Sequence, residues 1–210
     1  SHGKALGAVI DGCPAGLSLN EEDIQKFLDR RKPGQSRYTT ARKEGDLVEI
    51  LSGVFEGKTT GTPISLMVRN TDQRSRDYGN LAYSYRPGHA DFTFDAKYGF
   101  RDYRGGGRSS GRETIGRVAA GAIASRILET LGISFCTYTK SIGPVEITDF
   151  DAEEITRNAF YMPDASAASA AGAYLEECMK NQDSAGGIIE CRIKNVPAGL
   201  GNPVFEKLDA

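Results

Sequence analysis

The segment from Ser110 to Leu131 constrains the fold more than any other part of the sequence. Apolar residues recur there at steps of three and four, which predicts a helix with one buried face. The residues of that face are Ile115, Val118, Ala119, Ala122, Ile123, Ile127 and Leu131. Ser110-Gly111-Arg112-Glu113 fits a capping box, which predicts that the helix starts at residue 111. Ala, Gly and Ser crowd the segment, so the helix can pack closely against its neighbours.

Shorter patterns predict strands and two further helices. Apolar or alternating stretches predict strands at 5–11, 47–55, 63–68, 133–139 and 187–193. A helix is expected between a capping box at 18–21 and the Pro33-Gly34 stop, and another from Asp164 to about Met179. Residues 70–107 show little periodicity, and so long a stretch is more often functional than not. A chain of 210 residues can bury a core around these elements, as one large domain or two small ones.

One motif occurs twice in the chain. The strand pattern at 7–10 leads into Pro14-Ala15-Gly16-Leu17 and then a helix, and the pattern at 187–189 leads into Pro197-Ala198-Gly199-Leu200. Chance could produce one such echo. If the echo is real, the fold has two related halves, and the second begins near residue 184 and is cut as its helix starts.

Composition and charge exclude several classes of protein. The net charge is -2 and the pI is about 5.8, which argues against a general nucleic-acid-binding protein. No run approaches the length of a membrane span, and no signal peptide opens the chain. The four cysteines are scattered without a CxxC pair, so we expect neither a zinc site nor a disulfide framework but a reduced intracellular protein.

Arginines are concentrated in the middle of the chain. Nine of the 16 lie between Arg69 and Arg117, whereas residues 146–183 are acidic. Arginine suits planar, bidentate capture of phosphate or carboxylate. The alternative is a solvated face with ion pairs.

A glycine-rich loop at 104–110 runs directly into the helix that follows it. Its glycines, flanking arginines and two serines, with the positive end of the helix, predict an anion site. The loop matches neither a P-loop nor GxGxxG, and a flexible turn is the alternative. The basic turn at 30–40 either complements the dipole of the preceding helix or contacts a phosphorylated ligand.

The chain has only two histidines, His2 and His89. Each is either a structural or exposed residue, or a group that transfers protons near neutral pH. Asp91, close to His89 in sequence, could orient its ring or raise its pKa. No second His or Cys stands at ligand spacing, so we expect no metal site.

Together these motifs resemble the chorismate synthase family over the whole chain. The matching segments are SHGKALG at 1–7, DRRKPGQSRYTT at 29–40, GVFEGKTTGTPI at 53–64, NTDQRS at 70–75, RPGHAD at 86–91, YRGGGRSSGRET at 103–114 and VPAGLGNPVF at 196–205. The resemblance implies an α+β fold with long helices packed between antiparallel sheets and an internal pseudo-repeat. Residues 1–210 are then a single core domain that lacks both ends of the family chain.

The resemblance also implies a reaction, that of a carbon–oxygen lyase in aromatic amino-acid biosynthesis. The enzyme converts 5-enolpyruvylshikimate 3-phosphate to chorismate by a 1,4-elimination of phosphate. Reduced FMN is required without net redox change, and the cofactor carries that chemistry. NADPH is a possible reductant, the full-length enzyme is usually a homotetramer, and the expected location is cytoplasmic.

Site residues are carried over from the family motifs position by position. His2 resembles the general acid that meets the departing phosphate, and His89 the histidine that protonates or stabilises reduced flavin. The remaining matches are Arg31 and Arg37 as substrate ligands also associated with NADP, Arg86 and Arg112 as further substrate ligands, and Arg108, Ser109 and Ser110 as FMN contacts.

The chain also departs from the family pattern. The few residues before Ser1 and everything after Ala210 are absent, including an acidic residue credited with flavin deprotonation, and Gly111 stands where the family often has Ala. We therefore expect this chain to fold without making chorismate. The alternative function is an anion- or phosphate-binding core without catalysis. An RNA-binding domain is weakened by the pI of about 5.8.

Overall fold

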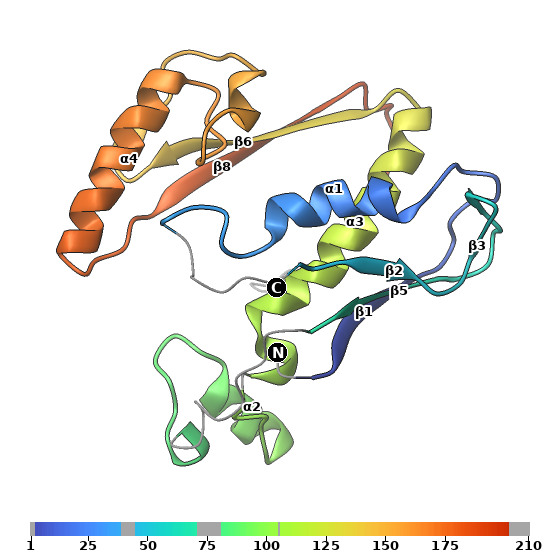
Figure 1. Cartoon of the computed structure of the whole chain (residues 1–210), viewed down its shortest axis with the longest axis horizontal. Helices are drawn as coiled ribbons and strands as arrows, with labels where there is room; N and C mark the ends of the chain where they lie inside the picture. The colour runs from blue at the N-terminus through green and yellow to red at the C-terminus, as the bar shows by residue number, and fades with distance from the viewer. Residues whose placement is uncertain (1–2, 39–44, 71–80, 105, 202–210) are drawn as a thin grey trace. The chain divides into compact units, whose positions relative to one another are not determined.

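The computed structural model describes residues 3–38, 45–70, 81–104 and 106–201 (Figure 1). The chain forms two compact units, Ser1–Ile127 and Leu128–Ala210. Both units combine helices with antiparallel strands, which confirms the predicted α+β class. The single core domain over 1–210 stays a prediction. In the described part of the chain, no helix is both long and apolar enough to cross a membrane.

A three-stranded antiparallel sheet organises the first unit. Its order is β1 (Ala5–Ile10), β5 (Ile64–Arg69) and β2 (Val48–Ile50), with β5 in the middle. Leu6 of β1 and Val48 of β2 both lie opposite Val68 of β5. A short hairpin of β3 (Val54–Phe55) and β4 (Lys58–Thr59) stands beside this sheet. The stretch predicted as one strand at 47–55 is therefore two strands, separated by a turn at Gly53 with φ 80°.

Helices α1 (Glu21–Arg31) and α3 (Thr114–Thr130) bury one face of that sheet. Alternate residues of β5 point into the core, because side chains of a strand alternate between its two faces. The core residues are Leu6, Cys13, Leu19, Ile24, Leu28, Val48, Ile64, Leu66, Val68, Ile115, Ala119, Ala122 and Ile123. Close packing of α3 is confirmed at Gly116, where a Cβ would lie 3.1 Å from the Gly7 carbonyl oxygen.

Both predicted helix starts differ in detail from the structure. Asn20, not Ser18, caps α1: its side chain accepts from the Asp23 amide at 3.0 Å, and the Asp23 carboxylate accepts from the Asn20 amide at 3.2 Å. The box is therefore two residues later than predicted, and Ser18 instead forms a β-bridge with Lys58. The helix predicted from residue 111 begins as a 3₁₀ turn, Gly111–Glu113, before α3 starts at Thr114.

The sequence patterns missed helix α2 (Asp91–Tyr98) inside the stretch that lacked periodicity. Its inward-facing residue is the carboxylate of Asp91 rather than an apolar side chain, so the search for an apolar stripe failed. The helix ends at Gly99, which adopts the left-handed φ of 77° that favours glycine.

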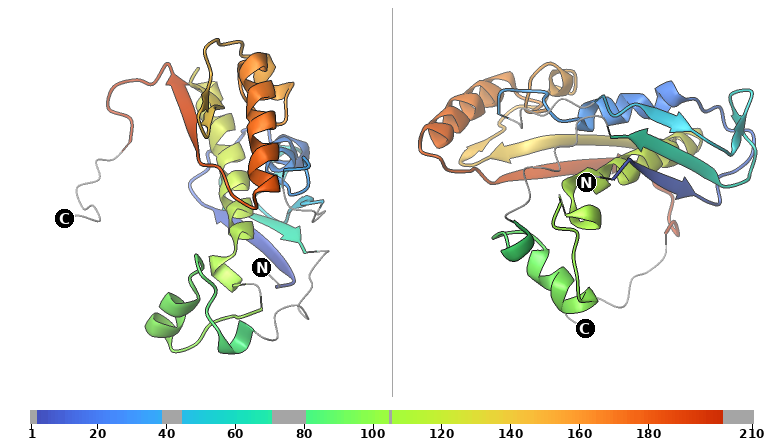
Figure 2. Two further views of the ribbon diagram at one scale, coloured as in Figure 1. Left: turned by 90° about the vertical axis from the view of Figure 1, so that its left-hand side faces the viewer. Right: turned by 60° about the horizontal axis from the view of Figure 1, so that its bottom comes forward.

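The second unit contains another three-stranded antiparallel sheet. Its order is β7 (Val145–Glu146), β6 (Ser134–Ile142) and β8 (Gly187–Lys194), with Ser134 opposite Lys194. Helix α4 (Ala165–Lys180) lies beside the end of β6 (Figures 1 and 2). Its small residues pack against Ile142 of β6 and Val145 of β7. Its N-cap is Asp164, as predicted.

The repeated sequence motif has a repeated backbone conformation. Gly12 after β1 and Asn195 after β8 both have positive φ, 75° and 62°. Four residues further along each copy, Gly16 and Gly199 have φ of 86° and 87°. The echo therefore extends from residue types to chain geometry. The helix predicted to follow the second copy lies outside the described residues.

Candidate functional site

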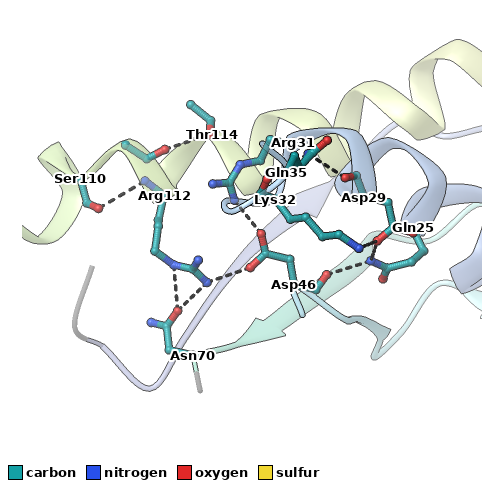
Figure 3. A network of polar contacts seen from close by, with 11 residues as sticks. Gln25, Asp29, Arg31, Lys32, Gln35, Asp46, Asn70, Ser110, Arg112 and Thr114 are labelled. Carbon is teal, nitrogen blue, oxygen red and sulfur yellow. Dashed lines mark hydrogen bonds and ion pairs between the residues drawn. The ribbon is translucent and has the colours of Figure 1, made fainter. Parts of the chain in front are cut away.

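Asp46 is the centre of a buried ionic cluster in the first unit. Its carboxylate is fully buried and accepts one guanidinium on each oxygen (Figure 3). Arg31, the last residue of α1, donates from Nη1 to Oδ2 at 2.9 Å. Arg112, in the 3₁₀ turn before α3, donates from Nη2 to Oδ1 at 3.0 Å. The structure thus brings two of the predicted substrate ligands onto one carboxylate.

Arg112 also has a second acceptor, the side chain of Asn70. Its Nε and Nη2 donate to Asn70 Oδ1 at 3.1 and 2.9 Å. The amide group of Asn70 donates in turn to the Gly3 carbonyl at 2.6 Å, and the Asn70 backbone N–H donates to Lys4 at 3.1 Å. The cluster therefore extends to the segment beside His2, which itself lies outside the described residues.

The backbone around Asp46 is held against α1. Gln25 donates from Nε2 to the Asp46 carbonyl at 3.2 Å and accepts the Val48 amide on Oε1 at 3.0 Å. Asp46 has φ 45°, in the left-handed region that Asp and Asn adopt more readily than other residues with a Cβ. These contacts fix the carboxylate relative to the helix that carries Arg31.

Glycines shape the loop that precedes Arg112. Gly106 and Gly107 have φ of 81° and 50°, and the Ser109 hydroxyl donates to the Gly106 carbonyl at 2.6 Å. Ser110 Oγ accepts the Arg112 amide at 3.3 Å. Both predicted FMN-contacting hydroxyls therefore have local structural partners as well. Ser110 is therefore the N-cap of this turn, and the Glu113 carboxylate lies 3.3 Å from Arg108 Nε.

Arg108 is an accessible cation of this loop, and Arg104 is exposed as well. Its side chain is 86% exposed, despite the contact with Glu113. An exposed guanidinium next to two hydroxyls has the chemistry to bind a ligand phosphate.

Arg86 is held by Asp91 at the entrance to α2. Nε and Nη2 of Arg86 each donate at 2.9 Å, to different oxygens of a nearly buried carboxylate. These hydrogen bonds from Arg86 hold the pKa of Asp91 well below its usual range. Arg86 also lies near the glycine loop, since a Cβ on Gly106 would be 3.7 Å from Arg86 Nη2.

His89 projects from the turn between Arg86 and α2. Its exposed ring places Nδ1 3.1 Å from the Pro87 carbonyl oxygen. A carbonyl oxygen can only accept, so Nδ1 carries the hydrogen and Nε2 of the neutral ring is left as an acceptor. Asp91, which the sequence made a candidate partner of this ring, bonds to Arg86 instead.

Arg37 is the one predicted substrate ligand of the 30–40 turn that does not reach Asp46. It is exposed, donates to the Tyr38 hydroxyl at 2.8 Å and lies over the Tyr38 ring at 5.0 Å. The structure therefore separates Arg31, held in the cluster, from Arg37 at the surface.

Comparison with known proteins decides the family. A family model described as chorismate synthase matches residues 1–210. The chain belongs to the chorismate synthase family. Curated chorismate synthases of Agathobacter rectalis and Lachnoclostridium phytofermentans are 68% and 67% identical to it over the whole chain. A solved structure titled as a chorismate synthase covers 96% of the chain with a TM-score of 0.75 and 33% identity.

The chain spans 58% of the length of each of these proteins. The sequence resemblance to the chorismate synthase family and the α+β fold that it implied are confirmed by the comparisons. The roles of individual residues stay predictions.

Two members of this ionic cluster, Asp46 and Asn70, escaped the sequence patterns. Both lie at the borders of predicted strands rather than in a motif with regular spacing. The signal was chemical: Asp46 is an acid that comes shortly after a basic turn, and Asn70 opens the NTDQRS segment that matches the family.

Proposed function

We propose that the residues of the ionic cluster around Asp46 form the substrate-binding part of a chorismate synthase, a lyase of aromatic amino-acid biosynthesis. The substrate is 5-enolpyruvylshikimate 3-phosphate. The reaction breaks a carbon–oxygen bond to phosphate and a ring carbon–hydrogen bond, and it forms one new double bond. The observation that carries the proposal is the pair of guanidiniums, Arg31 and Arg112, fixed on the buried carboxylate of Asp46.

The arginine pair suits a ligand with several negative charges. Arg31 keeps 18% of its side chain exposed, so the cluster has an accessible side as well as a buried one. Guanidinium groups bind phosphate and carboxylate oxygens in a bidentate manner, and groups held in place beforehand lose less entropy on binding. Arg86 and Arg37 belong to the same proposal as further substrate ligands.

His2 and His89 are proposed to transfer protons during the reaction. His89 has Nε2 as its available nitrogen, which suits proton exchange with a bound flavin. His2 is proposed as the general acid for the departing phosphate. The Asn70 amide supports this placement, because it holds the neighbouring Gly3 carbonyl within the arginine cluster.

Arg108, Ser109 and Ser110 are proposed to bind the FMN phosphate. Their fit rests on an exposed guanidinium and two hydroxyls at the start of a helix. Reduced FMN bound there would provide transient electron donation, with no net redox change. For the full-length protein, we also propose NADPH as a reductant contacted by Arg31 and Arg37, a homotetramer, and a cytoplasmic location.

Residues 1–210 alone are proposed to fold and bind anions without turnover. A site assembled from two parts of a protein loses contacts when one part is missing, and a misplacement of about 1 Å can cost about 10²-fold in rate. An anaerobic assay with dithionite-reduced FMN, which follows chorismate absorbance, tests turnover, and a titration with inorganic phosphate tests anion binding. The full-length protein should produce chorismate, and residues 1–210 should bind inorganic phosphate without producing it. No product from the full-length protein would contradict the proposed function.

A further inference from the structure

Asp46 is a buried carboxylate to which neither the sequence motifs nor the reaction assigns a role. Its side chain has no exposed surface, yet it is surrounded by polar groups rather than by the apolar core. A charge in such a place is retained only when it is paired and hydrogen-bonded. Its partners are Arg31 and Arg112, the two arginines proposed to hold the substrate.

The geometry of the pair depends on this carboxylate. Two guanidiniums repel each other, and each belongs to a long side chain with several rotatable bonds. Asp46 accepts Arg31 on Oδ2 and Arg112 on Oδ1, so the rigid carboxylate sets their separation. Gln25 fixes the Asp46 backbone to α1, and therefore the carboxylate is itself held in place.

Asn70 connects Arg112 to the N-terminal segment of the chain. Its Oδ1 accepts two N–H groups of Arg112, while its amide donates to the Gly3 carbonyl. Displacement of Arg112 would therefore also disturb the segment beside His2.

We propose that Asp46 is a positioning residue, which sets the spacing of Arg31 and Arg112 for a phosphorylated ligand and, through Asn70, the position of the segment at Gly3. This inference rests on the proposed function. Asp46 itself does not touch the substrate; it acts through the two arginines.

The test is Asp46→Asn in the full-length protein. Asn has the same shape and tolerates the φ of 45°, so the backbone is not strained. Its single carbonyl oxygen accepts one guanidinium, while its amide group faces the donors of the other. We expect KM for 5-enolpyruvylshikimate 3-phosphate to rise by about 10- to 100-fold, with a smaller fall in kcat. The dissociation constant of inorganic phosphate should rise in parallel.

Glu22→Gln is the matched control on α1. Glu22 is an exposed carboxylate in the first turn of the same helix. Its KM should equal that of the wild type. A purely structural Asp46 would lower the unfolding temperature and leave the KM of the folded fraction unchanged, which overturns the proposal. If Asp46→Asn does not fold, Asn70→Ala removes the other acceptor of Arg112, and an unchanged KM in that variant also overturns it.

Failure of the positioning role is distinguishable from failure of the proposed function. Turnover by the wild type with an unchanged KM in Asp46→Asn overturns the positioning role alone. Binding of inorganic phosphate by the wild type without turnover overturns the function alone, and the phosphate titration of the variants then decides the role of Asp46. If the wild type binds neither ligand, both are overturned.

Discussion

Arg86 and Asp91 form a two-pronged ion pair that closes the turn carrying His89. The two side-chain bonds are both 2.9 Å, and the Arg86 backbone N–H adds a third to the same carboxylate at 3.0 Å. The residues between them are thereby held as a short loop with the imidazole exposed. Arg86 thus has a structural task within the protein, beside the substrate contact proposed for it.

Replacing Asp91 by Asn should lower the unfolding free energy by about 2 kcal/mol near pH 7, because charged hydrogen bonds to Arg86 are lost. The folded-state pKa of Asp91 is depressed by Arg86, so this stabilisation is present above the unfolded-state value and is lost as the pH falls toward the folded-state value. Urea unfolding should show a difference in unfolding free energy between wild type and variant at about pH 7, and a smaller difference at about pH 3. Exposed Asp11→Asn is the control. A difference of equal size at both pH values would contradict the assignment.

Asp164→Ala should destabilise the second unit by about 2 kcal/mol, the upper end for loss of an N-cap. One carboxylate oxygen accepts the amides of Ser166 and Ala167 at 2.9 and 3.0 Å, and the other accepts the Thr148 amide at 3.0 Å. Hydrogen exchange of the backbone amides at the start of α4 should therefore be faster in Asp164→Ala. Asp183→Ala, which replaces an exposed residue, should leave that exchange rate unchanged. Unaltered protection in Asp164→Ala would show that the cap is dispensable.

The double change Ser109→Ala and Ser110→Ala should weaken FMN binding to the full-length protein by about tenfold, through loss of two ordinary hydrogen bonds. Flavin fluorescence titration measures the effect, and Ser184→Ala in an exposed loop provides the control. Both hydroxyls also have local partners, so the unfolding temperature must be measured as well. The same flavin affinity in a folded double variant would remove these serines from the FMN site.

His89→Asn should slow turnover of the full-length protein by about 10²- to 10⁴-fold. The Asn amide can still donate to the Pro87 carbonyl that Nδ1 contacts, but it cannot exchange a proton at the position of Nε2. His2→Ala should slow turnover by a similar factor but shift the pH profile differently, since one histidine is assigned to flavin and the other to phosphate. Wild-type rates in His89→Asn would exclude its catalytic role.

Regular elements were predictable where the physical cause was local. The strands at β1 and β5, the Asp164 cap and most of α3 follow from alternation, capping chemistry and helical spacing. Helix α2 escaped because its inward-facing side chain is an ionised carboxylate with an arginine partner. A search for hydrophobic periodicity does not detect such a residue.

The site was predictable as a set of residue types but not as an arrangement. Motifs singled out Arg31 and Arg112, yet the carboxylate that joins them is 15 residues from one and 66 from the other. Its position depends on Gln25 of α1, which bonds to the Asp46 carbonyl and to the amide of Val48 at the start of β2. These contacts exist only in the folded chain. The sequence also could not show that Arg37 lies apart from this cluster, because that separation depends on the folded chain as well.

The most direct test of the account is kcat/KM for 5-enolpyruvylshikimate 3-phosphate in full-length Arg112→Lys, assayed anaerobically with reduced FMN. Lysine keeps the charge but cannot bond to Asp46 and Asn70 in the geometry of the guanidinium. We expect chorismate formation by the wild type and a fall of about 100-fold in kcat/KM of the variant. Arg157→Lys, at a surface pair with Glu153, should match the wild type. A value for Arg112→Lys within about twofold of the wild type would contradict the claim that this cluster holds the substrate.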